Sequence, residues 1–102
     1  MRHEQHYALI WRNGKYSVGN AETIAKAYCK TKRLILGLLR FNGGNKFVYS
    51  IKLNGQWRPQ GTISDTRSHE ANRRAAYRDF FHNYLLNNQR EFSIITLTDY
   101  SR

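Results

Sequence analysis

Alternating hydrophobic and polar residues first identify a strand at Lys46–Leu53. Phe47, Tyr49, Ile51 and Leu53 fall on one face, and Val48, Ser50 and Lys52 fall on the other. A period of two is typical of a half-buried strand. The dipeptide Asn54-Gly55 follows, and it readily adopts the positive φ angles of a two-residue type I′ turn. The pattern therefore predicts a hairpin in which residues 56–58 return along the first strand.

Beyond this hairpin the period changes from two to 3.6 at Ser68, which predicts a helix that ends at Asn87 and Asn88. Its apolar positions recur every three or four residues: Ala71, Ala75, Tyr77, Phe80, Phe81, Tyr84 and Leu85. Three charged residues, Glu70, Arg74 and Arg78, share an exposed stripe, with Arg73 beside it. We expect the aromatic side of this helix to pack on the sheet.

The N-terminal part of the chain predicts a second hairpin and a second helix. Residues 7–11 and 15–18 read as strands joined by Asn13-Gly14. Asn20 has the side chain of an N-cap, so a helix is expected to begin near Ala21. At the other end of the chain, Phe92–Leu97 is rich in β-branched residues and predicts a closing strand.

The end of the first helix is ambiguous in the sequence. Helical spacing continues through Ile24, Ala27, Tyr28, Thr31, Ile35 and Leu38. One helix could therefore run to about Arg40, although Gly37 would cost roughly 1 kcal/mol relative to Ala. Alternatively, the helix stops near Lys32 and residues 34–41 form a buried strand. Periodicity does not decide between these two interpretations.

Together these elements predict a single α+β domain over residues 1–102, in which a small antiparallel sheet with two Asn-Gly hairpins packs against two helices. A length of 102 residues leaves no room for a second domain of ordinary size. The chain is 40% hydrophobic and 14% aromatic, which is typical of a folded protein and excludes a disordered one.

The charge distribution gives the strongest indication of function. Seventeen Lys and Arg residues oppose seven Asp and Glu residues, so the net charge is +10. Between Thr23 and Ser64 there is no acidic residue, whereas eight cations lie in that segment. A concentration of positive charge repels itself, and it is typical of a surface that binds a polyanion. The alternatives are an acidic protein partner or a solvated basic surface.

The candidate nucleic-acid-binding residues follow from this distribution. Lys26, Lys30 and Arg33 share the polar side of the first helix. Trp57 and Arg58 lie beside the turn of the hairpin, where an exposed indole could stack on a base while the arginine contacts a phosphate. Alternatively, Trp57 packs into the sheet and has a structural function. The same two interpretations, stacking on a base or packing in the sheet, apply to Trp11 and Tyr16. The full candidate set is Lys26, Lys30, Arg33, Lys46, Lys52, Trp57, Arg58, Arg73, Arg74 and Arg78.

Cys29 is the only cysteine, so an intramolecular disulfide and a thiolate metal site are both excluded. We expect no metal and no cofactor. The chain starts without the apolar run of a secretory signal, and no stretch approaches the roughly 18 apolar residues of a membrane span. These features predict a cytoplasmic protein that does not associate with a membrane.

If residues 34–41 form a strand, the elements follow the order of one helix, three antiparallel strands and a second helix. This order resembles the double-stranded RNA-binding domain. The second helix of that family opens with Lys-Lys-x-Ala-Lys-x-x-Ala-Ala, and Ala71, Ala75 and Ala76 stand at its three alanine positions. The resemblance implies phosphate contacts from the three lysine positions, which hold Ser68, His69 and Asn72 here. Arg67, Arg73 and Arg74 would have to replace those lysines.

The same region also resembles the three strands and helix of plant-type and phage-integrase DNA-binding domains. Gly61-Thr62-Ile63 and the helix containing Ala75-Ala76-Tyr77 carry this resemblance. It implies that the sheet lies in the major groove of DNA.

Three functions are therefore considered. The first is binding of DNA or RNA, mainly through phosphate contacts. The second is a small inhibitor or adaptor of phage or mobile-element type that docks a basic face on an acidic host protein or ribonucleoprotein. The third is a metal-independent ribonuclease toxin, with His69, Arg73 and Tyr77 as the reacting set. Because no paired carboxylates or phosphate-binding glycine loop are present, we expect the protein not to be an enzyme.

Overall fold

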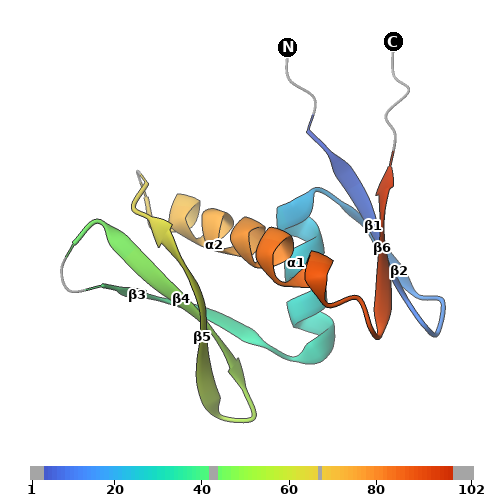
Figure 1. Cartoon of the computed structure of the whole chain (residues 1–102), viewed down its shortest axis with the longest axis horizontal. Helices are drawn as coiled ribbons and strands as arrows, with labels where there is room; N and C mark the ends of the chain where they lie inside the picture. Colours follow the sequence, from blue (N-terminus) through green and yellow to red (C-terminus); the bar gives the residue numbers. More distant parts are fainter. Residues whose placement is uncertain (1–3, 42–43, 67, 98–102) are drawn as a thin grey trace.

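The computed structural model describes residues 4–41, 44–66 and 68–97. Two helices lie between two antiparallel three-stranded sheets (Figure 1). The first sheet has the strand order β2-β1-β6 and the second has the order β3-β4-β5. The α+β class, the two helices and the two hairpins are confirmed, and the hairpins fall on separate sheets rather than on a common one.

The first sheet joins the two ends of the chain. β1 (His6–Trp11) pairs with β2 (Tyr16–Gly19) on one side and with β6 (Phe92–Leu97) on the other. In the predicted hairpin turn, Gly14 has φ 90° and donates its N–H to the carbonyl of Trp11 at 2.9 Å. A positive φ is readily accessible to glycine because it has no Cβ.

The second sheet contains the longest strands, β4 (Lys46–Leu53) and β5 (Gln56–Ser64), with β3 (Ile35–Arg40) at its edge. Asn54 and Gly55 have φ angles of 53° and 80°. Two consecutive positive φ angles confirm the type I′ turn expected from the Asn-Gly dipeptide. A bulge between Tyr49 and Ser50 shifts the register of β5 along β4.

The first helix, α1 (Ala21–Lys32), begins as predicted. The Asn20 side chain accepts a hydrogen bond from the Thr23 N–H at 2.9 Å. The helix ends at Arg33, whose φ of 59° and ψ of 46° turn the chain out of the helix into β3. Of the two interpretations, the shorter helix followed by a strand is therefore confirmed. The prediction that this strand is buried is wrong, because β3 is an edge strand with Ile35 58% and Leu39 74% exposed.

The second helix, α2 (His69–Asn83), is capped by the Ser68 side chain, which accepts a hydrogen bond from the Ala71 N–H at 3.1 Å. It ends earlier than predicted, and a 3₁₀ turn, η1 (Leu85–Asn87), follows it. Tyr84 lies at this junction and is 37% exposed, although helical spacing placed it in the core. The amide side chains of Asn87 and Asn88 bond to the carbonyls of Asn83 and Tyr84 and close the end of this segment.

Aromatic residues from both sheets and both helices meet in one core. Tyr28 of α1 contacts Trp11, Phe80 and Phe92, with ring centroids 5.8, 6.0 and 5.4 Å away. Tyr7 of β1 contacts Phe81 of α2 at 4.6 Å. Trp11 therefore belongs to the core, whereas Tyr16 is 71% exposed. No helix in the described part of the chain is long and apolar enough to cross a membrane.

Candidate nucleic-acid interface

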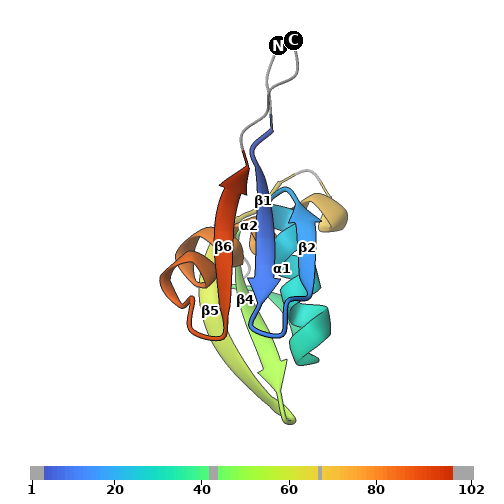
Figure 2. The same ribbon diagram turned by 90° about the vertical axis from the view of Figure 1, so that its right-hand side faces the viewer.

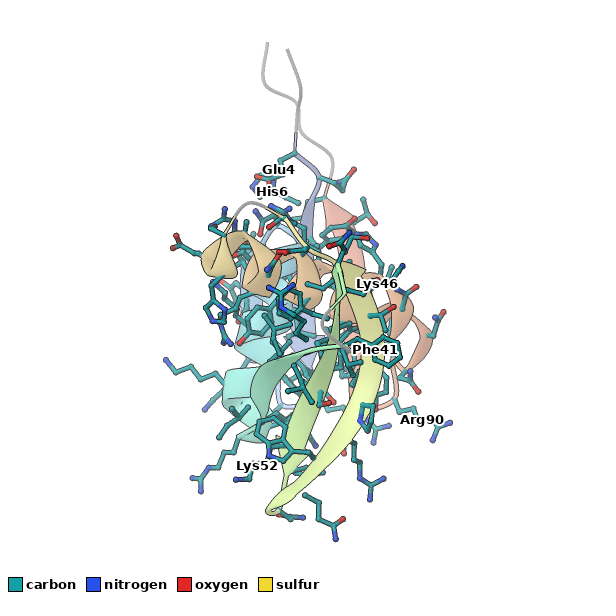
Figure 3. All side chains as sticks on the ribbon, turned by 90° about the vertical axis from the view of Figure 1, so that its left-hand side faces the viewer. Glu4, His6, Phe41, Lys46, Lys52 and Arg90 are labelled. Atoms are coloured by element: carbon teal, nitrogen blue, oxygen red, sulfur yellow. The ribbon has the colours of Figure 1, made fainter. Side chains whose placement is uncertain are left out.

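The sheet β3-β4-β5 has one face packed on the helices and one face that none of the described elements covers (Figure 3). Leu36, Tyr49, Ile51 and Ile63 are buried on the packed side. Because side chains alternate between the two faces of a strand, their neighbours in sequence point outward. We call this set the outer face: Ile35, Gly37, Leu39, Lys46, Val48, Ser50, Lys52, Trp57, Pro59, Thr62 and Ser64.

Trp57 is held in a defined position on the outer face. Its ring lies over Gly37, where a Cβ atom would meet the indole carbons at 2.9 Å. Gly37 and Trp57 lie on the two strands that flank β4, so the indole crosses the central strand. Lys52 is the register partner of Trp57, and its Nζ atom lies 5.6 Å from the ring centroid. Trp57 nevertheless remains 51% exposed.

The outer face carries positive charge without any carboxylate. All three of its strands lie in the segment between Thr23 and Ser64, which contains no Asp or Glu. Lys46 and Lys52 stand near opposite ends of β4 (Figure 3), about 20 Å apart at the rise of a strand. Neither lysine forms an ion pair with any of the described residues.

Arg33, at the end of α1, lies at the edge of the same sheet. Lys30 and Arg33 are both exposed, and Arg33 is two residues before Ile35. Ile35 pairs with Lys52, which in turn pairs with Trp57. The fold therefore brings Arg33 to the end of the sheet where Lys52 and Trp57 stand.

Other predicted cations have structural partners. Lys26 forms an ion pair with Glu22 at 2.8 Å, and Arg78 lies 3.9 Å from the same carboxylate. Arg73 donates hydrogen bonds to the carbonyl of Leu36 at 3.2 Å and to the Tyr77 hydroxyl at 3.3 Å. Lys26 and Arg78 therefore lie where α1 and α2 meet, and Arg73 lies where α2 meets β3. Arg78 also lines a shallow pocket with Thr62 and Ser64 of β5. Arg74, half-buried on α2, lies outside the outer face.

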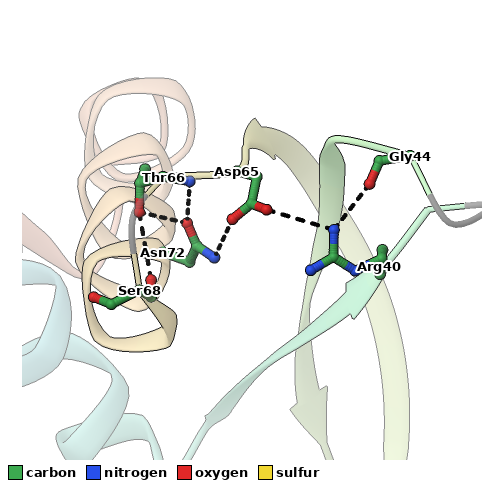
Figure 4. Close-up of polar contacts among 6 residues, drawn as sticks. All are labelled: Arg40, Gly44, Asp65, Thr66, Ser68 and Asn72. Atoms are coloured by element: carbon green, nitrogen blue, oxygen red, sulfur yellow. Dashed lines mark hydrogen bonds and ion pairs between the residues drawn. The ribbon is translucent and has the colours of Figure 1, made fainter.

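Two further cations of the acid-free segment are neutralised by carboxylates from outside it. Lys32 bonds to Glu91 at 2.8 Å. Arg40 lies 3.5 Å from Asp65 and bonds to the carbonyl of Gly44 at 2.9 Å (Figure 4). A hydrogen bond from Asn72 and the nearby Arg40 lower the pKa of Asp65. A hydrogen bond from Lys32 lowers the pKa of Glu91.

Trp57 and Arg58 do not form the expected joint site. They are consecutive residues in a strand, so they point to opposite faces of the sheet. Arg58 pairs with the buried Ile51 and lines a groove of about 680 Å³ between the sheet and the end of α2. A base stacked on Trp57 and a phosphate bound by Arg58 would therefore lie on opposite faces of the sheet.

The positions that carry the resemblance to the double-stranded RNA-binding domain have structural functions here. Ser68 caps α2, and Asn72 is 3% exposed and bonds to Thr66 and Asp65. The buried Asn72 side chain is not available to contact phosphate, whereas Ser68 is exposed. His69 is exposed, and Arg67 lies outside the described residues. Of the proposed ribonuclease set, Arg73 and Tyr77 are in contact, and Tyr77 is buried.

Two exposed apolar residues of the outer face, Ile35 and Leu39, were missed as candidate site residues. Their signal in the sequence is the uniformly apolar run at residues 34–39, which lacks the polar alternation of a strand with one solvated face. Among the described residues, no group of three or more His, Cys, Asp or Glu side chains is arranged to hold a metal ion.

Comparisons with protein-family models, with curated proteins and with solved structures give no match to this chain. Both resemblances stated above therefore stay predictions.

Proposed function

We propose that this protein binds nucleic acid through the outer face of the sheet β3-β4-β5. Lys46, Lys52 and the cations at the end of α1 would contact phosphates, and Trp57 would stack on an exposed base. The observation that carries the proposal is the half-exposed Trp57, fixed on Gly37 beside Lys52 on a face without a carboxylate. We place its action in the cytoplasm.

The dimensions of the face agree with this proposal. The backbones of the two outer strands are about 10 Å apart at a strand spacing of 4.7–4.9 Å, and the major groove of DNA is about 12 Å wide and admits a two-stranded β-ribbon. The hydroxyl groups of Ser50, Thr62 and Ser64 add hydrogen-bonding groups between the two lysines. Because two lysines give charge but little base discrimination, phosphate contacts should dominate the affinity.

The first test removes charge from the outer face. The double variant Lys46→Gln, Lys52→Gln should bind labelled duplex DNA, single-stranded DNA and single-stranded RNA more weakly than the wild-type protein. If both lysines contact phosphates of the duplex, the plot of log binding constant against log salt concentration should become shallower, with its negative slope smaller in magnitude by about 1.8. Fluorescence anisotropy over a range of salt concentrations measures both quantities.

A matched control removes the same charge from the opposite end of the molecule. Arg12 and Lys15 lie at the β1–β2 turn, on the other sheet. The double variant Arg12→Gln, Lys15→Gln should leave the affinity nearly unchanged. If the two double variants lose the same affinity, the outer face has no special contribution and the proposal fails.

A second test concerns Trp57. Stacking on an unpaired base is worth about 1–3 kcal/mol, so Trp57→Ala should weaken single-strand binding by about 5- to 150-fold. Trp57→Phe retains an aromatic face and should recover most of the loss. Equal losses in the two variants would rule out stacking.

Docking on a protein is the second candidate function, and the exposed Ile35 and Leu39 beside Trp57 favour it. Apolar side chains surrounded by cations are suited to an acidic protein with an apolar centre. Affinity purification with and without nuclease separates the two functions. A partner that remains after nuclease treatment and is lost in Leu39→Asp supports docking. Loss of every partner after nuclease treatment supports nucleic acid.

A further inference from the structure

The outward side of the sheet β2-β1-β6 is also not covered by any element in the described part of the chain. Figure 2 shows its three strands in front of the helices. Leu9 is fully buried on the packed side, where Tyr7 and Trp11 contact the aromatic core. By alternation and register, the opposite side carries a second set of residues, which we call the neutral face: His6, Ala8, Ile10, Tyr16, Val18, Ser93, Ile95 and Leu97.

The neutral face is apolar although the chain has a net charge of +10. None of its eight residues is Lys, Arg, Asp or Glu. Ala8 lies between Val18 and Ile95 in the register, and Ile10 lies between Tyr16 and Ser93, so the apolar side chains are contiguous. Tyr16 is 71%, Val18 51% and Ile95 48% exposed. A contiguous apolar patch on a polar protein is typical of an interaction site.

We propose that a second copy of this chain covers the neutral face. An acidic partner would gain nothing from a face without cations, and it would bind the basic surfaces instead. Two copies of a strongly cationic protein repel each other, and the repulsion is weakest when they meet through surfaces that are far from the cations of both copies. The neutral face meets that condition over most of its area, because the lysine-bearing outer face lies on the opposite side of the molecule (Figures 2 and 3). Arg12 and Lys15 bring positive charge to one end of the neutral face, in the turn beside Tyr16.

The expected dimer is symmetric, with the same face contributed by both copies. The two sheets would pack about 10 Å apart with their strands within about 30° of each other. If the neutral faces bury roughly 500 Å² per copy, or about 1,000 Å² in the pair, the contact reaches the lower limit of a specific interface. We therefore expect a dissociation constant in the micromolar range, and a dimer that is strengthened by salt.

The test is sedimentation equilibrium of the full chain after nuclease treatment, from about 1 to about 200 µM protein. The wild-type protein should change from monomer to dimer in this range. Raising NaCl to about 0.5 M should tighten the dimer, because screening reduces the repulsion between copies. Association through residual nucleic acid would instead weaken with salt. A wild-type protein that stays monomeric throughout would overturn the proposal.

Two variants and one control locate the interface. Ile95→Asp places a carboxylate in the apolar contact and should weaken the dimer at least tenfold, because desolvating that charge is unfavourable. Tyr16→Ser should weaken it in the same direction, and it provides a second variant if Ile95→Asp fails to fold. Leu39→Asp makes the same change on the opposite sheet and should leave the dimer intact. A dimer lost in Leu39→Asp but retained in both other variants would contradict the assignment.

Discussion

Asn72 connects the start of α2 to the end of the second sheet. Its Oδ1 atom accepts hydrogen bonds from the N–H and the hydroxyl of Thr66, at 2.8 and 2.7 Å (Figure 4). Its Nδ2 atom donates to Asp65 at 3.0 Å, and Asp65 in turn lies beside Arg40. A buried amide with all of these partners fixes the loop between β5 and α2, so it contributes to stability rather than to ligand binding.

Asn72→Ala should lower the free energy of unfolding by about 2–3 kcal/mol, because the Thr66 and Asp65 groups lose their buried partner. Urea unfolding followed by circular dichroism measures this change. Asn83→Ala is the control, since Asn83 lies on the same helix and its amide bonds to Asp79 in an exposed position. Its cost should stay below about 1 kcal/mol. Equal costs in both variants would show that the Asn72 contacts are not structurally important.

Buried ionisable groups in α1 predict how stability changes at alkaline pH. Burial raises the pKa of Cys29 from 9.0 to about 12. Burial, followed by the nearby Tyr84 and Glu91, raises the pKa of Tyr28 from 10.0 to about 12. The folded state therefore retains protons that the unfolded state loses. Stability is fully present below about pH 9 and declines as the pH rises toward 12.

Cys29→Ala isolates the thiol contribution to this decline. Between about pH 9 and pH 10 the variant should lose less stability than the wild-type protein, because its unfolded chain has no thiol to ionise. Urea unfolding at several pH values measures how steeply the stability of each protein falls, and the difference between the two slopes isolates the thiol from the effects of pH that both proteins share. Parallel slopes would contradict the raised pKa of Cys29.

At the scale of elements, Arg33 decides where α1 ends. It adopts φ 59°, and its N–H and that of Leu34 bond back to the carbonyls of Lys30 and Cys29. Glycine is the usual residue at such a helix terminus, since a side chain makes a positive φ unfavourable. Arg33→Gly should therefore stabilise the protein by about 0.5–1 kcal/mol.

Lys30→Gly is the matched control for that variant. Lys30 lies inside the last turn of α1, so glycine there should destabilise the protein by about 1 kcal/mol. Thermal or urea unfolding measures both changes. If Arg33→Gly were destabilising to the same extent, the chain would be helical through residue 33, and the longer helix considered from the sequence would be the correct one.

The local elements could be predicted because their signals are local. The Asn-Gly turn at residues 54–55, the Asn20 cap and the alternation of β4 each depend on a few neighbouring residues. The division into two sheets depends on the pairing of β1 with β6, from opposite ends of the chain. No local pattern contains that pairing, which explains why one sheet was expected.

The candidate site was only partly predictable for a related reason. The acid-free segment correctly identified the sheet that carries Lys46, Lys52 and Trp57 without carboxylates. It could not show that Glu22, Asp65 and Glu91 approach Lys26, Arg40 and Lys32 from outside the segment. The alternation rule applied to residues 57 and 58 would have separated Trp57 from Arg58, because consecutive strand residues point to opposite faces.

At the scale of the whole molecule, the two uncovered sheet faces lie on opposite sides of a helical layer (Figures 1 to 3). The molecule measures 44 by 39 by 19 Å. A dimer formed through the neutral faces would direct the two lysine-bearing outer faces away from each other. Such a dimer could not place both outer faces on one short duplex, but it could connect two nucleic-acid segments.

This geometry predicts that the wild-type protein bridges nucleic acids. One duplex is labelled with a fluorescence donor and another with an acceptor, and both are mixed with the protein at concentrations that favour the dimer. Bridging should then produce fluorescence energy transfer between the two duplexes. Ile95→Asp should bind each duplex by anisotropy without producing energy transfer, whereas Lys46→Gln, Lys52→Gln should lose both signals. Bridging that persists in Ile95→Asp would mean that a single copy contacts two duplexes. In that case the cations outside the outer face, such as Arg12 and Lys15, would form a second binding surface.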